Sequence, residues 1–141
     1  MGLNATDLTD KQKQMMSPAD RRALGKLGMT AEEARERWAA GEEKKLQSLI
    51  ANFLNLKEIY FETDRMDRKT SGKVGRPDFR ICYRGRWIGV ECKAEGGTLS
   101  PEQKATLEKI RKNGGVAIVA FGLPAVQEAL RAIDKENSND A

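Results

Sequence analysis

Two short stretches of this sequence carry side chains that could do chemistry together. Asp78 closes a Gly-Arg-Pro-Asp segment at 75–78 and begins a strand-like run, and Glu91 and Lys93 lie in the next strand-like run. Residues two apart in a strand point to the same side, so Glu91 and Lys93 share a face while Cys92 points to the other. Two carboxylates beside an ammonium group favour a hard divalent cation and hydrolysis of a phosphodiester bond.

Each of these residues also has an ordinary structural interpretation. An aspartate after a proline is common in turns. Glu91 could form a cross-strand ion pair with Lys93 or with an arginine on the neighbouring strand. Lys93 could be a solvated strand lysine, although a position between two carboxylates makes that interpretation weaker.

The composition excludes several other chemistries. The chain has 141 residues, which predicts one domain, and it contains no histidine, which excludes histidine-centred nucleases, catalytic triads and most zinc sites. The 25 basic and 21 acidic residues give a net charge of +4, which would suit a polyanionic partner without requiring one. We interpret Cys82 and Cys92 as reduced, packed thiols of a cytoplasmic protein. No apolar run approaches the length of a membrane span, and Met1–Met16 has no signal-peptide pattern.

The elements that must position these side chains follow from periodicity, caps and turn residues. The order of elements predicts an α/β fold, with helices on a mixed β-sheet. The first half of the chain is expected to form a short helix from Ser17 to about Gly25 or Gly28, a helix from Thr30 through Leu54 that Gly41 could break in two, a strand at Ile59–Phe61 and a polar loop from Asp64 to Pro77. Two strands then follow at Phe79–Tyr83 and Trp87–Cys92, joined by a tight hairpin at 84–86. The rest is expected to form a helix from Ser100 to Asn113, a buried strand at Val116–Phe121 parallel to a neighbour, a helix from Pro124 to about Asp134, and a disordered tail.

Two further positions carry alternatives. Glu43 lies three residues before Leu46 and so shares the apolar face of the first long helix, but the adjacent Glu42 is close behind, and the helix phase decides between them. Gln103 is the third helical residue after Ser100, where its side chain can close a capping box or border the site, and the two roles can coexist. We interpret Trp38 and Trp87 as packing residues.

Four motifs in this order resemble the virus-type replication-repair nuclease (VRR-NUC) family of the PD-(D/E)XK nuclease superfamily. They are Glu43 before Gln47 on a helix, Gly-Arg-Pro-Asp at 75–78, Val-Glu-Cys-Lys at 90–93, and Leu-Ser-Pro-Glu-Gln-Lys at 99–104. The resemblance covers about Glu42 to Phe121 and implies a restriction-endonuclease-like core. A lone Glu-x-Lys is a weak signal, whereas four motifs in order are specific. Cys92 departs from the usual aliphatic residue, and nothing carries over to the first forty residues.

The resemblance implies a role for each site residue. Asp78, Glu91, the carbonyl of Cys92 and Glu43 would hold the metal, Mg²⁺ by preference with Mn²⁺ as a substitute. Lys93 would orient or help to deprotonate the attacking water or stabilise charge on the phosphorane, and Gln103 would border the site. The expected organisation is an N-terminal helical extension over 1–40, a nuclease core over 41–136 and a disordered tail over 137–141.

The loop before Asp78 is the expected DNA contact. Its five basic residues outnumber its two acids, and it leads directly into the site, so it could bind a phosphate backbone; an ordinary mobile basic loop is the alternative. The five are Arg65, Arg68, Lys69, Lys73 and Arg76.

The expected function is therefore a metal-dependent, structure-specific DNA endonuclease that cuts branched DNA such as Holliday junctions or flaps, in a bacterial or phage-infected cell. The alternatives are a restriction- or transposon-type endonuclease of the same superfamily and a non-catalytic nucleic-acid-binding module on this fold. A two-fold branched substrate favours a homodimer. Its surface would come from apolar residues of the N-terminal segment, namely Leu24, Leu27, Met29 and Trp38.

Overall fold

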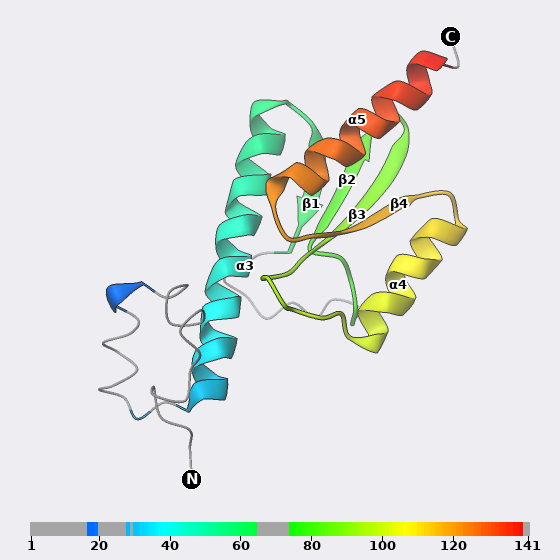
Figure 1. Cartoon of the computed structure of the whole chain (residues 1–141). Coiled ribbons are helices and arrows are strands. Elements are labelled where there is room, and N and C mark those ends of the chain that lie inside the picture. Colours follow the sequence, from blue (N-terminus) through cyan, green and yellow to red (C-terminus); the bar gives the residue numbers. More distant parts are fainter. Residues whose placement is uncertain (1–16, 20–27, 29, 65–73, 140–141) are drawn as a thin grey trace. The chain divides into compact units, whose positions relative to one another are not determined.

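The computed structural model of the chain describes residues 17–19, 28, 30–64 and 74–139. The chain forms two compact units, Met1–Glu42 and Glu43–Ala141, and the boundary falls within the first long helix. The elements, labelled in Figure 1, are α3 (Ala31–Leu56), β1 (Tyr60–Thr63), β2 (Phe79–Tyr83), β3 (Arg86–Cys92), α4 (Pro101–Lys112), β4 (Val116–Ala120) and α5 (Leu123–Asn139).

The strands form one mixed sheet in the order β1-β2-β3-β4. β1 and β3 each pair antiparallel with β2, and β4 pairs parallel with β3. The β2–β3 hairpin turns at Arg84 and Gly85, whose φ angles of 48° and 77° are those of the tight turns that match strand twist. The predicted α/β class, the tight hairpin and the parallel last strand are confirmed.

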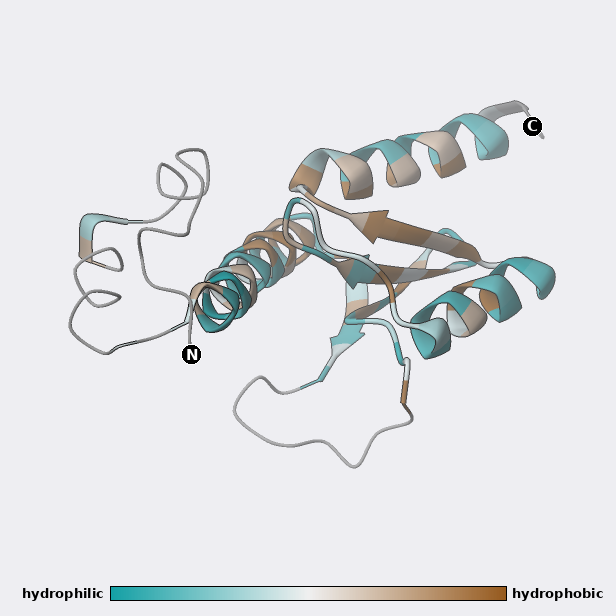
Figure 2. Cartoon of the chain, turned by 60° about the horizontal axis from the view of Figure 1, so that its bottom comes forward, coloured by the Kyte–Doolittle hydropathy of each residue, from teal (hydrophilic) through white to brown (hydrophobic). Residues whose placement is uncertain are grey.

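The two faces of the sheet have different cover (Figure 2). Side chains of one parity, such as Ile81 on β2 and Val90 on β3, pack in the core with residues of α3 and α5. Side chains of the other parity face α4, where Ile110 lies against Gly89 of β3. Because the strand period is two, the alternation in β3 sends Cys92 into the core and Glu91 toward α4.

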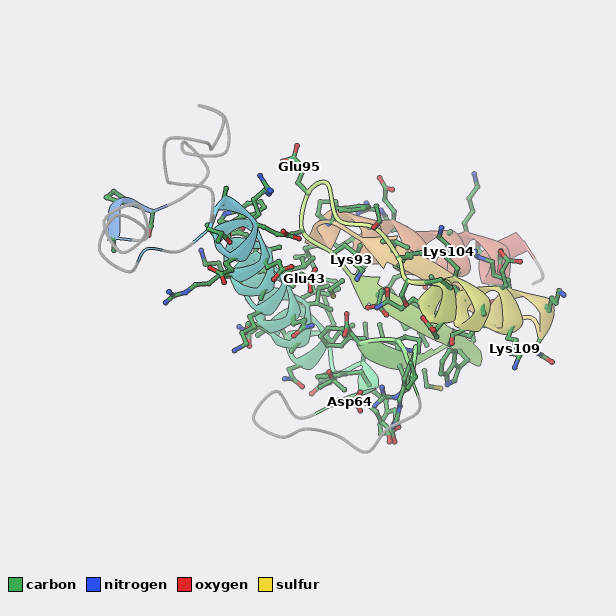
Figure 3. All side chains as sticks on the ribbon, turned by 90° about the horizontal axis from the view of Figure 1, so that it is seen from below. Glu43, Asp64, Lys93, Glu95, Lys104 and Lys109 are labelled. Atoms are coloured by element: carbon green, nitrogen blue, oxygen red, sulfur yellow. The ribbon has the colours of Figure 1, made fainter. Side chains whose placement is uncertain are left out.

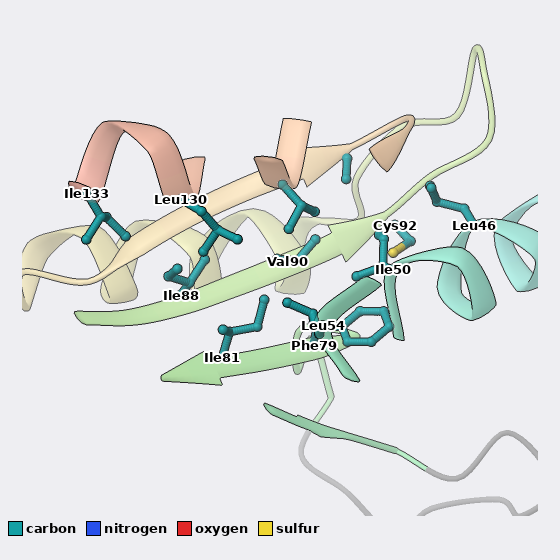
Figure 4. Close-up of a cluster of buried hydrophobic side chains, with 12 residues drawn as sticks. Leu46, Ile50, Leu54, Phe79, Ile81, Ile88, Val90, Cys92, Leu130 and Ile133 are labelled. Carbon is teal, nitrogen blue, oxygen red and sulfur yellow. The ribbon is translucent and has the colours of Figure 1, made fainter. Parts of the chain in front are cut away.

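The core is a contiguous apolar cluster, shown in Figure 4. α3 packs against the sheet through this cluster, because the buried residues of α3 recur at helical spacing. The buried members are Leu46, Ile50, Leu54, Phe79, Ile81, Ile88, Val90, Cys92, Ala120, Val126, Leu130 and Ile133.

Several sequence predictions need correction. α3 runs without a break through Gly41, because a single helical glycine costs only about 1 kcal/mol. α5 continues to Asn139 rather than ending near Asp134, so residues 137–139 are helical and not a disordered tail. β4 is partly exposed instead of buried on both faces, because it lies at the edge of the described sheet.

Other predictions lie outside the described residues. They are the short helix beyond Ala19, the loop residues Arg65, Arg68, Lys69 and Lys73, and the apolar Leu24, Leu27 and Met29. No helix in the described part of the chain is long and apolar enough to cross a membrane.

Candidate functional site

The β2–β3 register brings the two central acids together. Phe79 pairs with Val90, so Asp78 and Glu91 occupy the next position along the same pair of strands and face the same side. Asp78 is held there because its Oδ2 accepts a hydrogen bond of 2.8 Å from the backbone N–H of Cys92. The sheet register therefore places the two carboxylates that the sequence singled out at one point.

Glu91 is the buried charged residue of this site. It is only 4% exposed, and among the described residues it is the one polar or charged residue that is as buried as the apolar core. Burial, and then the negative charge of Asp78 and a hydrogen bond with its side chain, raise the pKa of Glu91 to about 8. Lys93 opposes that rise and Glu43 adds to it. Three charged side chains thus act on one buried carboxyl group.

Gln103 makes both of the contacts that the sequence left open. Its Oε1 accepts a hydrogen bond of 2.9 Å from the Ser100 backbone N–H, and its own N–H donates to Ser100 Oγ at 3.1 Å, which completes the capping box of α4. Its Nε2 donates to Glu91 Oε1 at 2.8 Å. One amide therefore ties the start of α4 to the buried acid.

Glu43 reaches the site from α3. Its Oε1 accepts a long hydrogen bond of 3.4 Å from the backbone N–H of Ala94, directly after Lys93 (Figure 3). The helix phase set by the buried Leu46 and Ile50 turns position 43 toward the end of β3.

Lys93 is half-buried at the end of β3. Its backbone N–H donates to the carbonyl of Ala120 at 3.0 Å, which extends the pairing between β3 and β4 by one residue. A turn follows directly, in which the Gly97 N–H donates to the Ala94 carbonyl at 2.9 Å. A Cβ at Gly97 would lie 3.6 Å from both Cβ and Cδ of Lys93, so this turn packs along the lysine stem. Backbone pairing on one side and the turn on the other hold the ammonium group near Glu91.

Cys92 contributes through its backbone. The thiol is fully buried, and burial raises its pKa far above the usual range, so it remains a neutral core group. Cys92 and Cys82 are both free thiols. Cys82 is exposed, whereas the sequence analysis predicted a packed thiol. The N–H of Cys92 is committed to Asp78, while the metal-binding role of its carbonyl stays a prediction.

The donor set suits a hard cation in its chemistry. Asp78, Glu91 and Glu43 offer carboxylate oxygens of the kind that Mg²⁺ and Mn²⁺ prefer, and a cation would relieve the repulsion that raises the pKa of Glu91. Within the described ranges, however, no three Asp, Glu, Cys or His side chains are already arranged to hold a metal ion. In this arrangement one carboxylate oxygen of each of Asp78, Glu43 and Glu91 accepts a hydrogen bond from the protein itself.

Of the predicted DNA contacts, Arg76 is the one that the structure describes. Its Nη1 lies 3.6 Å from Asp64 Oδ1, at the other end of the loop. The same oxygen lies 3.3 Å from Nη2 of Arg80, whose Nη1 donates to the Pro77 carbonyl at 3.0 Å. Sequence analysis missed Arg80, although its spacing of two from Asp78 could have placed it on the same face.

Gly75 explains how the Gly-Arg-Pro-Asp segment is seated. Its φ of +83° is one that residues with a side chain rarely adopt, and a Cβ there would lie 2.6 Å from the carbonyl oxygen of Glu102. The segment thus passes directly over the first turn of α4, the same turn that carries Gln103. Asp78, through the segment that precedes it, and Glu91, through Gln103, are therefore both positioned by the first turn of α4.

Comparison of the chain with models of protein families gives no match, and neither do comparisons with curated proteins or with solved structures.

Proposed function

We propose that this chain is a divalent-metal-dependent DNA endonuclease that hydrolyses phosphodiester bonds, with branched DNA as its substrate, in the cytoplasm of a bacterial or phage-infected cell. The proposal rests on one observation above all: the buried carboxyl of Glu91 lies beside Asp78, with Lys93 acting on the same group. A protein that only needed a stable core would gain nothing from an acid pair at that place.

The interpretation of Glu91 as a structural ion-pair residue fits the contacts less well. Its hydrogen-bond donor is Gln103, a neutral amide, and the residue opposite it in the register is another acid, Asp78. A cross-strand salt bridge would instead lower the pKa of the glutamate, whereas here the pKa is raised. Strongly perturbed acids in a group of charged residues are typical of functional sites.

The residues divide the work between them. Asp78 and Glu91 would hold the cation, with Glu43 and the Cys92 carbonyl as further ligands. When bound, the cation supplies Lewis-acid activation of the phosphodiester. Lys93 is the one ammonium group among these residues, so it would orient the attacking water or stabilise negative charge as the phosphorus becomes five-coordinate. Gln103 would take part as a further catalytic residue, through its hydrogen bond to Glu91.

The architecture is compatible with this assignment. A helix, three antiparallel strands, a helix and a parallel strand occur in the order expected for a restriction-endonuclease-like core. We include that core in the proposal, together with the VRR-NUC resemblance that suggested it.

A cleavage assay tests the proposal. The full chain would be incubated with labelled linear, single-stranded, flapped and four-way-junction DNA, each with Mg²⁺, with Mn²⁺ or with EDTA. We expect metal-dependent cleavage of at least one branched substrate by the wild type and none by Asp78→Ala. Cleavage that survives in Asp78→Ala would assign the activity to a contaminant, and the absence of cleavage under every condition would contradict the nuclease assignment.

A further inference from the structure

Trp87 lies on the site face of the sheet and is 43% exposed, contrary to the packing role that the sequence suggested. A Cβ at Gly89 would lie 3.1 Å from Cζ3 of Trp87, 3.2 Å from Cγ of Pro77 and 2.9 Å from Cδ1 of Ile110. The indole therefore rests over a glycine, next to the proline that precedes Asp78. It is fixed on its inner side and accessible on its outer side.

The position of Trp87 relative to the acids is set by β3. Trp87 and Glu91 are four residues apart on one strand, so they face the same side at a separation of roughly 13 Å. That distance corresponds to about four nucleotide steps at 3.4 Å each along one strand of B-form DNA. A strand whose phosphate lies at Glu91 can therefore present a base about four nucleotides away to Trp87.

The surroundings of Trp87 favour a nucleic-acid strand over a protein surface. Cys82 lies opposite Trp87 in the register and Tyr60 lies opposite Cys82, and both are exposed. The adjacent row on this face consists of Glu62 and Arg80, so charges interrupt the apolar patch that a protein partner would need. Arg80, which donates to the carbonyl of Pro77, is already paired with Asp64 and Glu62. An exposed aromatic face among polar neighbours matches a nucleobase, which stacks on aromatic side chains.

We propose that Trp87 stacks on an unpaired nucleobase of the DNA strand that enters the site. The inference rests on the proposed function and deepens it, because it makes DNA with unpaired nucleotides about four steps from the cleaved bond the preferred substrate class. A base inside continuous duplex keeps its own stacking partners and cannot use the indole face.

The experiment uses the fluorescence of Trp87 itself. The chain has two tryptophans, so Trp38→Phe leaves Trp87 as the single reporter. A short oligothymidylate, added in EDTA to prevent cleavage, should quench this emission in a saturable way. Inorganic polyphosphate, which carries the charge without bases, should leave the emission almost unchanged.

An affinity measurement that keeps Trp38 provides the second readout. By anisotropy of a labelled oligothymidylate, Trp87→Ala should bind about 10-fold more weakly than the wild type, and Trp87→Phe should lie between the two. Leu56→Ala, which removes another strongly exposed apolar side chain, should bind like the wild type. Equal affinity of Trp87→Ala and wild type, or binding without quenching, would overturn the stacking role.

The two proposals fail in different ways. If the wild type cleaves branched DNA but Trp87 shows no quenching, the nuclease assignment stands and the stacking role is wrong. If quenching occurs but no substrate is cut with any metal, the chain binds unpaired DNA without hydrolysing it. Under the full proposal, Trp87→Ala should lower cleavage of flapped DNA more than cleavage of continuous duplex.

Discussion

Gln103 Nε2 donates a hydrogen bond of 2.8 Å to Oε1 of Glu91, while the other atom of the same amide, Oε1, closes the capping box of α4. The start of a helix and the buried acid of the site are therefore joined through a single side chain. Because the Gly75 segment also lies against this turn of the helix, the end of α4 sets the positions of both Asp78 and Glu91.

We first predict that the two roles of Gln103, in the capping box of α4 and in the hydrogen bond to Glu91, can be separated by mutation. Ser100→Ala removes the cap hydroxyl but leaves the Gln103–Glu91 bond, so it should lower the free energy of unfolding by about 1 kcal/mol and retain most activity. Gln103→Ala should lower stability by a similar or larger amount and reduce cleavage as well. Chemical denaturation together with initial cleavage rates measures both effects. Equal activity losses in the two variants would show that Gln103 acts only as a cap.

The pH dependence of stability should report on Glu91. An unfolded glutamate titrates near 4.5, and the folded pKa is about 8, so the folded chain holds more protons between these values. The free energy of unfolding therefore falls as pH rises through that window, and the contribution is fully present below 4.5 and lost above 8. Between pH 5 and pH 9 the wild type should lose on the order of 4 kcal/mol of its free energy of unfolding through this group, and Glu91→Gln should not show this loss. Denaturation curves of both proteins at these two pH values test the prediction.

Metal binding should compete with the same proton. Mn²⁺ should raise the melting temperature of the wild type more at pH 8.5 than at pH 6, because the carboxyl group must lose its proton to become a ligand. EDTA should reverse the shift, and Asp78→Ala should show little of it at either pH. Differential scanning fluorimetry with and without Mn²⁺ gives this readout independently of catalysis. A shift that is the same at both pH values would contradict Glu91 as a ligand.

Catalysis should depend on Asp78, Glu91 and Lys93 as a unit. Each alanine variant should lower the cleavage rate by about 1,000-fold or more, and double variants should be little worse than single ones. Lys93→Ala should keep the Mn²⁺-induced melting shift, since it removes the ammonium group and no ligand. Lys109→Ala, which removes an exposed lysine of α4, is the matched control and should cleave like the wild type. Normal cleavage by Lys93→Ala would contradict the mechanism.

Comparison with Gly114 can separate the steric effect of the close contact between Gly75 and α4 from the effect of the positive φ angle. Both have φ near +85°, but a Cβ at Gly114 would meet nothing within 4 Å, whereas one at Gly75 would meet the Glu102 carbonyl oxygen at 2.6 Å. Gly114→Ala should cost about 1 kcal/mol for the backbone conformation alone. Gly75→Ala should cost more, about 2–3 kcal/mol, and should reduce cleavage because it displaces Asp78 from α4. Similar losses of stability and activity in both variants would argue against this packing role.

Most of the local structure of this chain could be predicted from its sequence. Alternation and turn residues predicted β2, β3 and their hairpin, and the Ser-Pro-Glu-Gln start predicted α4, because caps and periodicity are properties of neighbouring residues. The pairing of Glu91 with Lys93 on one face followed from the two-residue period of a strand. Two predictions of where a helix ends were wrong, at Gly41 and at the end of α5. A single glycine is too weak a helix breaker to end α3.

Features that depend on residues far apart in the chain could be seen only once the elements were packed together. The phase of α3 on the sheet brought Glu43 to the end of β3, and the packing of α4 brought the Gln103 amide to Glu91. Burial of Glu91 and the charge of Asp78, which together raise its pKa, exist only when the sheet register is formed. The exposure of Trp87 is likewise a property of the folded chain. Such long-range contacts leave no periodic trace in the sequence, because each depends on the relative placement of two whole elements.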